Sequence, residues 1–298
     1  MNELTALRSR LGSRLAATSW VQVIKPGIVS GNAIAVLGGY FLAAHNQFHL
    51  LTLLAAVIGT MLVIASGCVA NNIIDRDIDG TMSRTRNRVL VTGHMAVKTA
   101  LVYSSLLLGL GLFVLAQTGD LAVKSALFGY FVYVGLYSLY FKRHSVWGTL
   151  IGSFSGAIPP VIGYAAVTNQ ADAAYWVLFA MFSIWQLPHA YAIAIFRDKD
   201  YRKANIPVLP LQVSFQTTRI HMIATILAFA VIASLLTILG YTGWVYLTAL
   251  LILSALWLKV ALQKVKPSAV EKGKWARQIF VYSVIIITVL SFCMAIHI

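Results

Sequence analysis

The sequence is poor in charge, in acidic residues and in cysteine, and each shortage excludes a class of protein. Only 11% of its 298 residues are charged, against about 25% in a typical soluble protein. Its 9 acidic residues face 23 lysines and arginines. The two cysteines, Cys68 and Cys293, lie within apolar runs, which excludes a disulfide scaffold and a cysteine-rich metal site. Segments of about 10 alternating polar and apolar residues are absent, which excludes a transmembrane β-barrel.

Long apolar runs are what the sequence has in abundance. Hydrophobic residues make up 59% of it, and runs of about 20 residues, enough to cross a bilayer, recur along nearly the whole chain. We predict an all-α polytopic membrane protein with a single domain over residues 1–298. Its nine predicted transmembrane helices cover residues 21–44, 50–72, 97–117, 121–141, 146–166, 174–196, 219–240, 243–262 and 277–297. Residues 1–20 are expected to form a cytoplasmic tail, either an amphipathic helix on the membrane surface or a flexible basic segment.

The positive charges indicate how the chain crosses the membrane. With these spans, 22 of the 23 lysines and arginines fall on one side, and Lys124 alone falls on the other. Such asymmetry places the basic side in the cytoplasm, with the N-terminus cytoplasmic and the C-terminus outside. We expect a multi-pass protein of the bacterial inner membrane. The net charge of +14 then reflects topology and contact with the lipid bilayer rather than binding to nucleic acid.

The densest acidic cluster comes directly after the second apolar run. On a helix with about 100° per residue, Asp75 lies about 40° from Asn71, Asp79 about 80° and Asn72 about 100°. These four side chains therefore share one face, whereas Asp77 points elsewhere. Carboxylate and amide oxygens at the end of a membrane helix are costly unless something binds them. They suit Mg²⁺, which keeps some waters and takes further ligands from phosphate.

Cationic side chains follow three of the predicted spans on the same side as the acidic cluster. They are Arg84, Arg88, Lys142, Arg143, Arg197 and Lys199. Cations beside Mg²⁺ ligands bind a diphosphate and stabilise the charge that develops as it leaves. Loss of diphosphate from an allylic carbon leaves a carbocation, which needs a dry apolar chamber of the kind a helix bundle supplies. The simpler alternative is that these charges only orient the chain in the membrane.

A second acidic cluster, Asp198 and Asp200, follows the sixth span. Because spans two and six run in the same direction, both clusters should lie at one membrane face. We therefore predict that spans 1–4 and 5–8 form two parallel four-helix halves, with the ninth helix added.

Two features lie inside predicted spans. Pro159 and Pro160 should break the fifth span, and a broken helix is tolerated at membrane depth where it lines a cavity. Gln186 and His189 lie one turn apart in the sixth span. Polar residues at this depth are candidates for function; the alternative is a packing hydrogen bond between helices.

The pattern Asn71-Asn72-x-x-Asp75-x-x-x-Asp79 resembles the first aspartate motif of the UbiA superfamily of intramembrane prenyltransferases. Residues 71–93, 137–164 and 185–210, with Lys25-Pro26-Gly27, are similar to the branch of that superfamily that modifies haem. The resemblance implies nine transmembrane helices and transfer of farnesyl from farnesyl diphosphate to the 2-vinyl group of haem B. Water addition would then give haem O, which a downstream haem-modifying enzyme or a terminal oxidase takes up. It also implies that Asn72, Asp75 and Asp79 bind Mg²⁺ and diphosphate, with Asn71 as a helper.

The chain departs from the wider superfamily at two further elements. The second motif is usually Asp-x-x-x-Asp, but Phe196 stands four residues before Asp200, and Asp198 is the remaining carboxylate. A second Mg²⁺ at Asp198 is therefore left open, and Arg197 and Lys199 are expected to bind the diphosphate directly.

The superfamily's Tyr-x-x-x-Lys element is also displaced, since Ser138 stands four residues before Lys142. Both departures are shared with the haem branch. For that acceptor, His189 is expected to ligate the haem iron or to orient the attacking water. Two alternatives stay open at this point: a prenyltransferase acting on a quinone precursor, and a membrane transporter built from paired halves.

Overall fold

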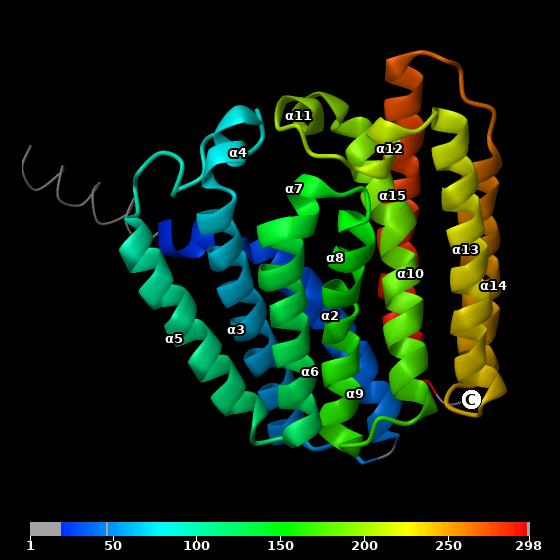
Figure 1. Ribbon diagram of the computed structural model, residues 1–298. Helices are drawn as coiled ribbons and strands as arrows, with labels where there is room; N and C mark the ends of the chain where they lie inside the picture. The colour runs from blue at the N-terminus through cyan, green and yellow to red at the C-terminus, as the bar shows by residue number, and fades with distance from the viewer. Residues whose placement is uncertain (1–18, 46, 297–298) are drawn as a thin grey trace, which may run out of the picture.

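The computed structural model describes residues 19–45 and 47–296, in which the apolar runs form nine membrane-length helices that lie side by side (Figure 1). They are α2 (Pro26–Ala44), α3 (Leu50–Ile74), α5 (Val97–Leu115), the continuous run Asp120–His144, the run Gly148–Thr168, α10 (Ala173–Phe196), α13 (Phe215–Ile238), α14 (Trp244–Leu262) and α15 (Ala269–Cys293). The prediction of nine spans is confirmed. Among the observed helix bounds, the start of α15 differs most from its predicted position, since α15 begins eight residues before residue 277. The predicted tail, residues 1–20, lies almost entirely outside the described residues.

Short helices at one end of the molecule repeat the same arrangement in both halves. α3 packs against α5, and α10 packs against α13. After α3 comes the six-residue helix α4 (Arg76–Thr81), and after α10 comes the six-residue helix α11 (Asp198–Lys203). Figure 1 shows α4 and α11 at the same end, together with α12 (Leu209–Gln212). The expectation of two parallel halves therefore fits the structure.

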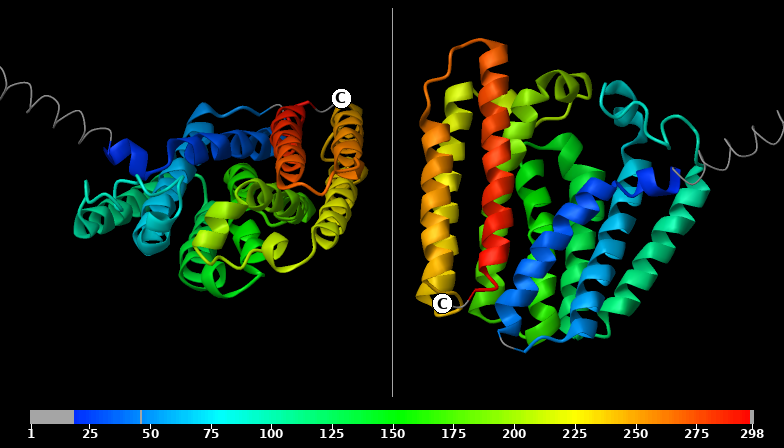
Figure 2. Two further views of the ribbon diagram at one scale, coloured as in Figure 1. Left: turned by 90° about the horizontal axis from the view of Figure 1, so that it is seen from above. Right: turned by 180° about the vertical axis from the view of Figure 1, so that it is seen from behind.

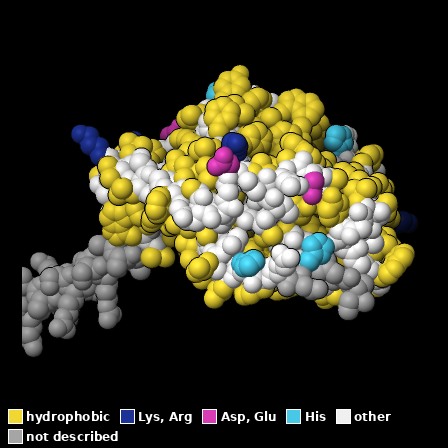
Figure 3. Space-filling model, turned by 90° about the horizontal axis from the view of Figure 1, so that it is seen from below, with side chains coloured by type: hydrophobic (Ala, Val, Ile, Leu, Met, Phe, Trp, Pro, Cys, Tyr) yellow, Lys and Arg dark blue, Asp and Glu magenta, His cyan; other side chains and the backbone are white. Residues whose placement is uncertain are grey.

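The two ends of the molecule differ in charge. The loops that carry the basic residues lie at the end of α4 and α11. The opposite end, seen in Figure 3, shows few charged side chains. Lys124 lies there in a loose ion pair with Asp120, in which the two charged atoms are 3.9 Å apart. The basic loops thus share one end, as the predicted spans require, and the assignment of that end to the cytoplasm stays a prediction.

The fifth span is interrupted at Ala157, between α8 (Gly148–Gly156) and α9 (Ile158–Thr168), as the proline pair predicts. α9 is buried along nearly its whole length. It packs on α2 at backbone distance, because a Cβ added at Gly39 would overlap the carbonyl of Pro160, so small residues are required there. Most residues of α8 are only partly buried. The tightly packed α9 leaves no space for the chamber expected beside this span, whereas the surface of α8 is partly free.

Seen from above, α2 and α15 lie along one side of the bundle and α6 to α10 along the other, with α3 and α5 at one end and α13 and α14 at the opposite end (Figure 2). Large apolar side chains point outward from the bundle, such as Phe113 on α5 and Val231 on α13. An apolar exterior of this kind is what a lipid environment requires.

Candidate active site

The acidic cluster lies where α3 passes into α4, and its side chains are sorted as the helical pattern predicts. Asn71, Asn72, Asp75 and Asp79 are all at most 4% exposed, whereas the side chain of Asp77 is 65% exposed. α3 ends at Ile74, yet the backbone N–H groups of Asp75 and Asp79 still donate to carbonyls four residues earlier, at 2.8 Å each. The junction thus keeps the helical repeat, and the predicted face is confirmed.

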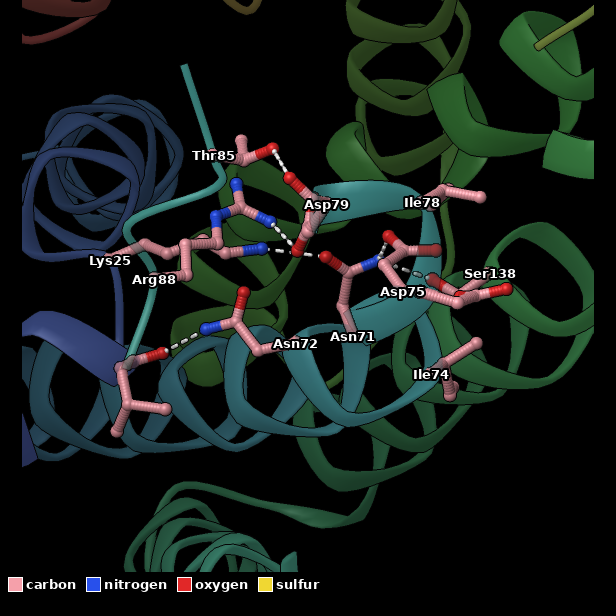
Figure 4. Close-up of polar contacts among 12 residues, drawn as sticks. Lys25, Asn71, Asn72, Ile74, Asp75, Ile78, Asp79, Thr85, Arg88 and Ser138 are labelled. Carbon is pink, nitrogen blue, oxygen red and sulfur yellow. Dashed lines mark hydrogen bonds and ion pairs between the residues drawn. The ribbon is translucent and has the colours of Figure 1, made fainter. Parts of the chain in front are cut away.

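Cations hold both buried carboxylates. Arg88 forms an ion pair with Asp79, and Lys142 forms one with Asp75 (Figure 4 shows the first of these). Arg143 donates to both carboxylate oxygens of Asp77 at 2.7 Å and lies 3.7 Å from Asp75. The hydrogen bond from Arg143 lowers the pKa of Asp77 to about 2. Three of the six predicted cations therefore contact the acidic cluster directly.

A fourth cation, Lys25, was not expected in the site. Its Nζ donates to Asn71 Oδ1 at 2.6 Å, and Asn71 Nδ2 donates in turn to Asp75 Oδ2 at 2.7 Å and to Ser138 Oγ at 3.0 Å (Figure 4). Burial lowers the pKa of Lys25 to about 8. Lys25 belongs to the Lys-Pro-Gly stretch that opens α2, and only the packing of α2 beside α3 brings it to Asn71.

Ser138 lies in a π-helical segment, and Lys142 follows directly after it. Within the fourth span, α6 (Asp120–Tyr130) passes into the π-helix η1 (Phe131–Phe141) and then into the short α7 (Lys142–His144). The N–H of Lys142 donates to the carbonyl of Tyr137, five residues earlier, as a π-helix requires. A π-helical turn holds one residue more than an α-helical turn. Tyr137, five residues before Lys142, therefore takes the position relative to Lys142 that the tyrosine of a Tyr-x-x-x-Lys element would have in an α-helix.

Two buried oxygens in this cluster have no hydrogen-bond partner within the described residues: Asn72 Oδ1 and Asp75 Oδ1. Asn72 Nδ2 donates to the carbonyl of Val23 at 2.8 Å, which fixes the direction of its Oδ1. Buried polar atoms without partners are rare and costly. Together with Asp79, these oxygens are the hard ligands that suit Mg²⁺. The fit leaves the rest of the metal's shell to water and phosphate, because in the described part of the chain no three acidic, histidine or cysteine side chains lie so that they could hold a metal ion together.

The second acidic cluster holds loops together. Asp200 Oδ1 accepts hydrogen bonds from the Ser83 backbone N–H at 2.9 Å and from its hydroxyl at 2.7 Å. Although burial opposes it, these bonds lower the pKa of Asp200. Asp198 pairs with Arg202 at 2.8 Å on the surface. The structure therefore brings Asp200 to the loop after α4, and it leaves Asp198 paired outside the Asp75 cluster.

The remaining predicted residues lie around these clusters. Arg84 and Lys199 are exposed, and the charge of Arg84 reaches Asp200 and Tyr201. Arg197 lies over the ring of Phe196, 5.8 Å from its centroid. His189, inside α10, is bonded to Ser283 of α15.

Buried carboxylates at a helix end, with cations in contact with them inside a bundle of membrane-length helices, are the features expected of an intramembrane prenyltransferase. Residues 32–284 match the model of the UbiA prenyltransferase family, so the chain belongs to this family. Solved structures share the fold. That of digeranylgeranylglyceryl phosphate synthase has a TM-score of 0.77 at 18% identity and covers 94% of this chain and 99% of its own. A UbiA homologue from Archaeoglobus fulgidus bound to GPP and Mg²⁺ has a TM-score of 0.61 at 14% identity and covers 90% and 99%.

Curated relatives match nearly the whole chain. A protoheme IX farnesyltransferase from Pectobacterium carotovorum is 52% identical over 93% of this chain and 94% of its own. Protoheme IX farnesyltransferase 1 from Shewanella frigidimarina is 50% identical over 97% and 95%. A third relative of that name, from Pseudomonas syringae pv. syringae, is 52% identical over 93% and 94%. The resemblance to the haem-modifying branch is confirmed.

Proposed function

We propose that the chain transfers the farnesyl group of farnesyl diphosphate to the 2-vinyl group of haem B, with addition of water, and releases haem O and diphosphate. The observation that carries the prenyl-transfer chemistry is the cluster of Asn72, Asp75 and Asp79. Two of its buried oxygens lack a hydrogen-bond partner within the described residues, and its carboxylates are held by cations. The relatives at about 50% identity support haem B as the acceptor.

The cations change partner when substrate binds. Without a diphosphate, Lys142 and Arg88 neutralise Asp75 and Asp79. Asn72, Asp75 and Asp79 would hold Mg²⁺, which would supply positive charge to stabilise the leaving diphosphate. Lys142 and Arg88 then turn from the carboxylates to the phosphate oxygens, where charge-assisted hydrogen bonds are strong. Arg143, 3.7 Å from Asp75, adds a further cation beside this group, and Arg84 and Lys199 are available from the segments that follow α3 and α10.

Two tyrosines beside the acidic cluster are placed to stabilise the carbocation. Tyr133 and Tyr137 of η1 stack with ring centroids 5.9 Å apart. Gly67 and Gly152 give these rings room, because a Cβ at either would come within 3.1 Å of a ring carbon. Aromatic faces attract cations more strongly when water is excluded. The farnesyl cation then adds to the terminal vinyl carbon, and water captures the resulting cation next to the pyrrole ring.

We also propose where the reaction takes place. The site lies at the basic end of the bundle, which the positive-inside rule assigns to the cytoplasm. The chain is then a multi-pass protein of the bacterial inner membrane, and haem O passes to a downstream haem-modifying enzyme or to a terminal oxidase. A second Mg²⁺ near Asp198 is not part of the proposal, because Asp198 lies partly exposed on α11 with Arg202 as its partner.

A comparison of two acceptors tests the proposal. Membranes containing the protein are incubated with Mg²⁺, farnesyl diphosphate and either haem B or 4-hydroxybenzoate, and products are identified by mass spectrometry. We expect a farnesylated, hydrated haem from haem B and no product from the phenol. Asp75→Asn should abolish formation of the haem product while the protein stays in the membrane. Product from the phenol alone would refute haem as acceptor. Substrate flux without any product would favour a transporter.

A further inference from the structure

The contact between α10 and α15 holds a row of aromatic and cationic side chains that the diphosphate site does not use. This row, named here the α10–α15 seam, consists of Trp185, His189, Phe196, Arg197, Arg277 and Phe280. The His189 ring lies between Trp185 and Phe280, with centroids at 5.0 and 4.8 Å. Phe280 contacts Phe196 at 5.7 Å. The guanidinium groups of Arg197 and Arg277 lie 5.8 and 5.7 Å from the Phe196 ring.

Ser283 fixes the protonation of His189. Its hydroxyl donates its single hydrogen to the carbonyl of Phe280 at 2.6 Å. It can therefore only accept from His189 Nδ1, which lies 2.7 Å away. The histidine thus carries its proton on Nδ1, and Nε2 presents a lone pair that has no hydrogen-bond partner among residues 19–45 and 47–296. A neutral imidazole whose other nitrogen donates a hydrogen bond is the usual form of a metal-ligating histidine.

The seam has its charge at the membrane surface and its imidazole at depth. Arg197 directly follows α10, eight residues beyond His189 and about 12 Å along a helix, and Arg277 lies six residues before Ser283 on α15, about 9 Å along it. Neither arginine forms an ion pair in the described part of the chain. Two cations without an ion-pair partner among the described residues thus lie at the surface end of an apolar, aromatic row that contains one unpaired imidazole nitrogen.

We infer that the α10–α15 seam binds the haem acceptor, with His189 Nε2 on the iron and Arg197 and Arg277 on the two propionates. This inference rests on the proposed function, because it takes haem B as the substrate. A planar macrocycle with an axial metal position and two carboxylates at one edge matches what the seam offers. Arg197, expected from the sequence to bind diphosphate, is assigned to a propionate instead. Ser283 is a positioning residue that orients the imidazole.

Haem titration of the purified protein in lipid nanodiscs tests the iron ligand, with farnesyl diphosphate left out. Wild type should give the absorption spectrum of imidazole-ligated haem. His189→Ala should lose that spectrum, and added imidazole should restore it, while binding of metal-free protoporphyrin IX changes less than about twofold. Ser283→Ala should weaken haem binding about tenfold, and Ser283→Thr, which keeps a hydroxyl, should recover it. His221→Ala is the matched control, because this exposed histidine lies on α13.

The arginines are tested with haem and its dimethyl ester, which lacks both carboxylates. Arg197→Gln and Arg277→Gln should each weaken haem binding about two- to fivefold, as exposed ion pairs do, and leave ester binding unchanged. Lys274→Gln, on the exposed surface of α15, is the control. Equal losses for both ligands would overturn the propionate contacts.

The two proposals fail in different ways. If wild type forms haem O while His189→Ala keeps the wild-type haem spectrum, the seam is only packing and the proposed function stands. If wild type forms no product from haem B in the same preparation, the haem assignment fails and the seam inference falls with it.

Discussion

Removing the positive charge of Lys142 should raise the affinity of the site for Mg²⁺ and lower its affinity for farnesyl diphosphate. Lys142 pairs with Asp75, and the exposed fractions of the two side chains are 13% and 0%. Breaking a buried ion pair costs about 3–5 kcal/mol. The lower limit applies here, because Arg143 lies 3.7 Å from the same carboxylate. Lys142→Met should therefore lose about 3 kcal/mol of stability when no metal is present.

Mg²⁺ should recover much of that loss, because it takes the place of the missing ammonium beside Asp75. If all of the 3 kcal/mol returned as binding, Mg²⁺ affinity would rise about 100-fold, since 1.4 kcal/mol is about tenfold; this is an upper limit. Farnesyl diphosphate, in contrast, loses a charge-assisted hydrogen bond from Lys142. A bond of this kind is worth about 1.5–3 kcal/mol, so diphosphate affinity should fall about 10- to 100-fold.

The measurement is thermal unfolding of the protein in nanodiscs, with EDTA or with increasing Mg²⁺, combined with calorimetric titration of each ligand. Lys142→Met should unfold at a lower temperature than wild type in EDTA, and Mg²⁺ should narrow the difference. Lys124→Met is the matched control, because Lys124 is 73% exposed at the opposite end of the bundle. Unchanged or weaker Mg²⁺ binding in Lys142→Met would refute the view that Lys142 holds the place of the metal.

Three further outcomes follow from single contacts. Burial lowers the pKa of Lys25 to about 8, so Lys25 loses its positive charge as the pH rises through 8, and the affinity for farnesyl diphosphate should fall. Lys25→Arg should move this fall in affinity to higher pH. Constant affinity between pH 7 and 9 would contradict the role of Lys25. Asp172 caps α10 and accepts a tyrosine hydroxyl, so Asp172→Ala should cost about 1–2 kcal/mol in thermal unfolding without changing diphosphate affinity. Gly39→Ala should cost about 1–3 kcal/mol through overlap with Pro160, whereas Gly31→Ala on the same helix, with open space around it, should be neutral.

Features with a local period could be predicted from the sequence. The nine spans follow from apolar runs of bilayer length, and the burial of Asp75 and Asp79 with exposure of Asp77 follows from helical geometry alone. α15 is longer than predicted because its first turns, from Ala269 to Arg277, are charged and extend beyond the apolar run. A hydropathy argument does not detect a helix that continues past the membrane.

Contacts between distant segments could not be predicted in this way. Lys25 reaches Asn71 across 46 residues, and Asp200 reaches Ser83 across 117. The π-helix is equally hidden, because a shift from four-residue to five-residue hydrogen bonding leaves an apolar run looking the same. It nevertheless decides which residue is in register with Lys142. The structure therefore adds mainly the partners of the predicted site residues.

The charge balance of the site explains why it holds so many internal cations. Asp75 and Asp79 contribute two negative charges, and Lys25, Arg88 and Lys142 contribute three positive charges. Mg²⁺ alone would raise this small positive excess in a poorly hydrated place, where charges interact strongly. Farnesyl diphosphate carries about three negative charges near neutral pH, so its Mg²⁺ complex is close to one negative charge and would bring the site to neutrality. Mg²⁺ and diphosphate should therefore enter together, and release of diphosphate should return Lys142 and Arg88 to their carboxylates.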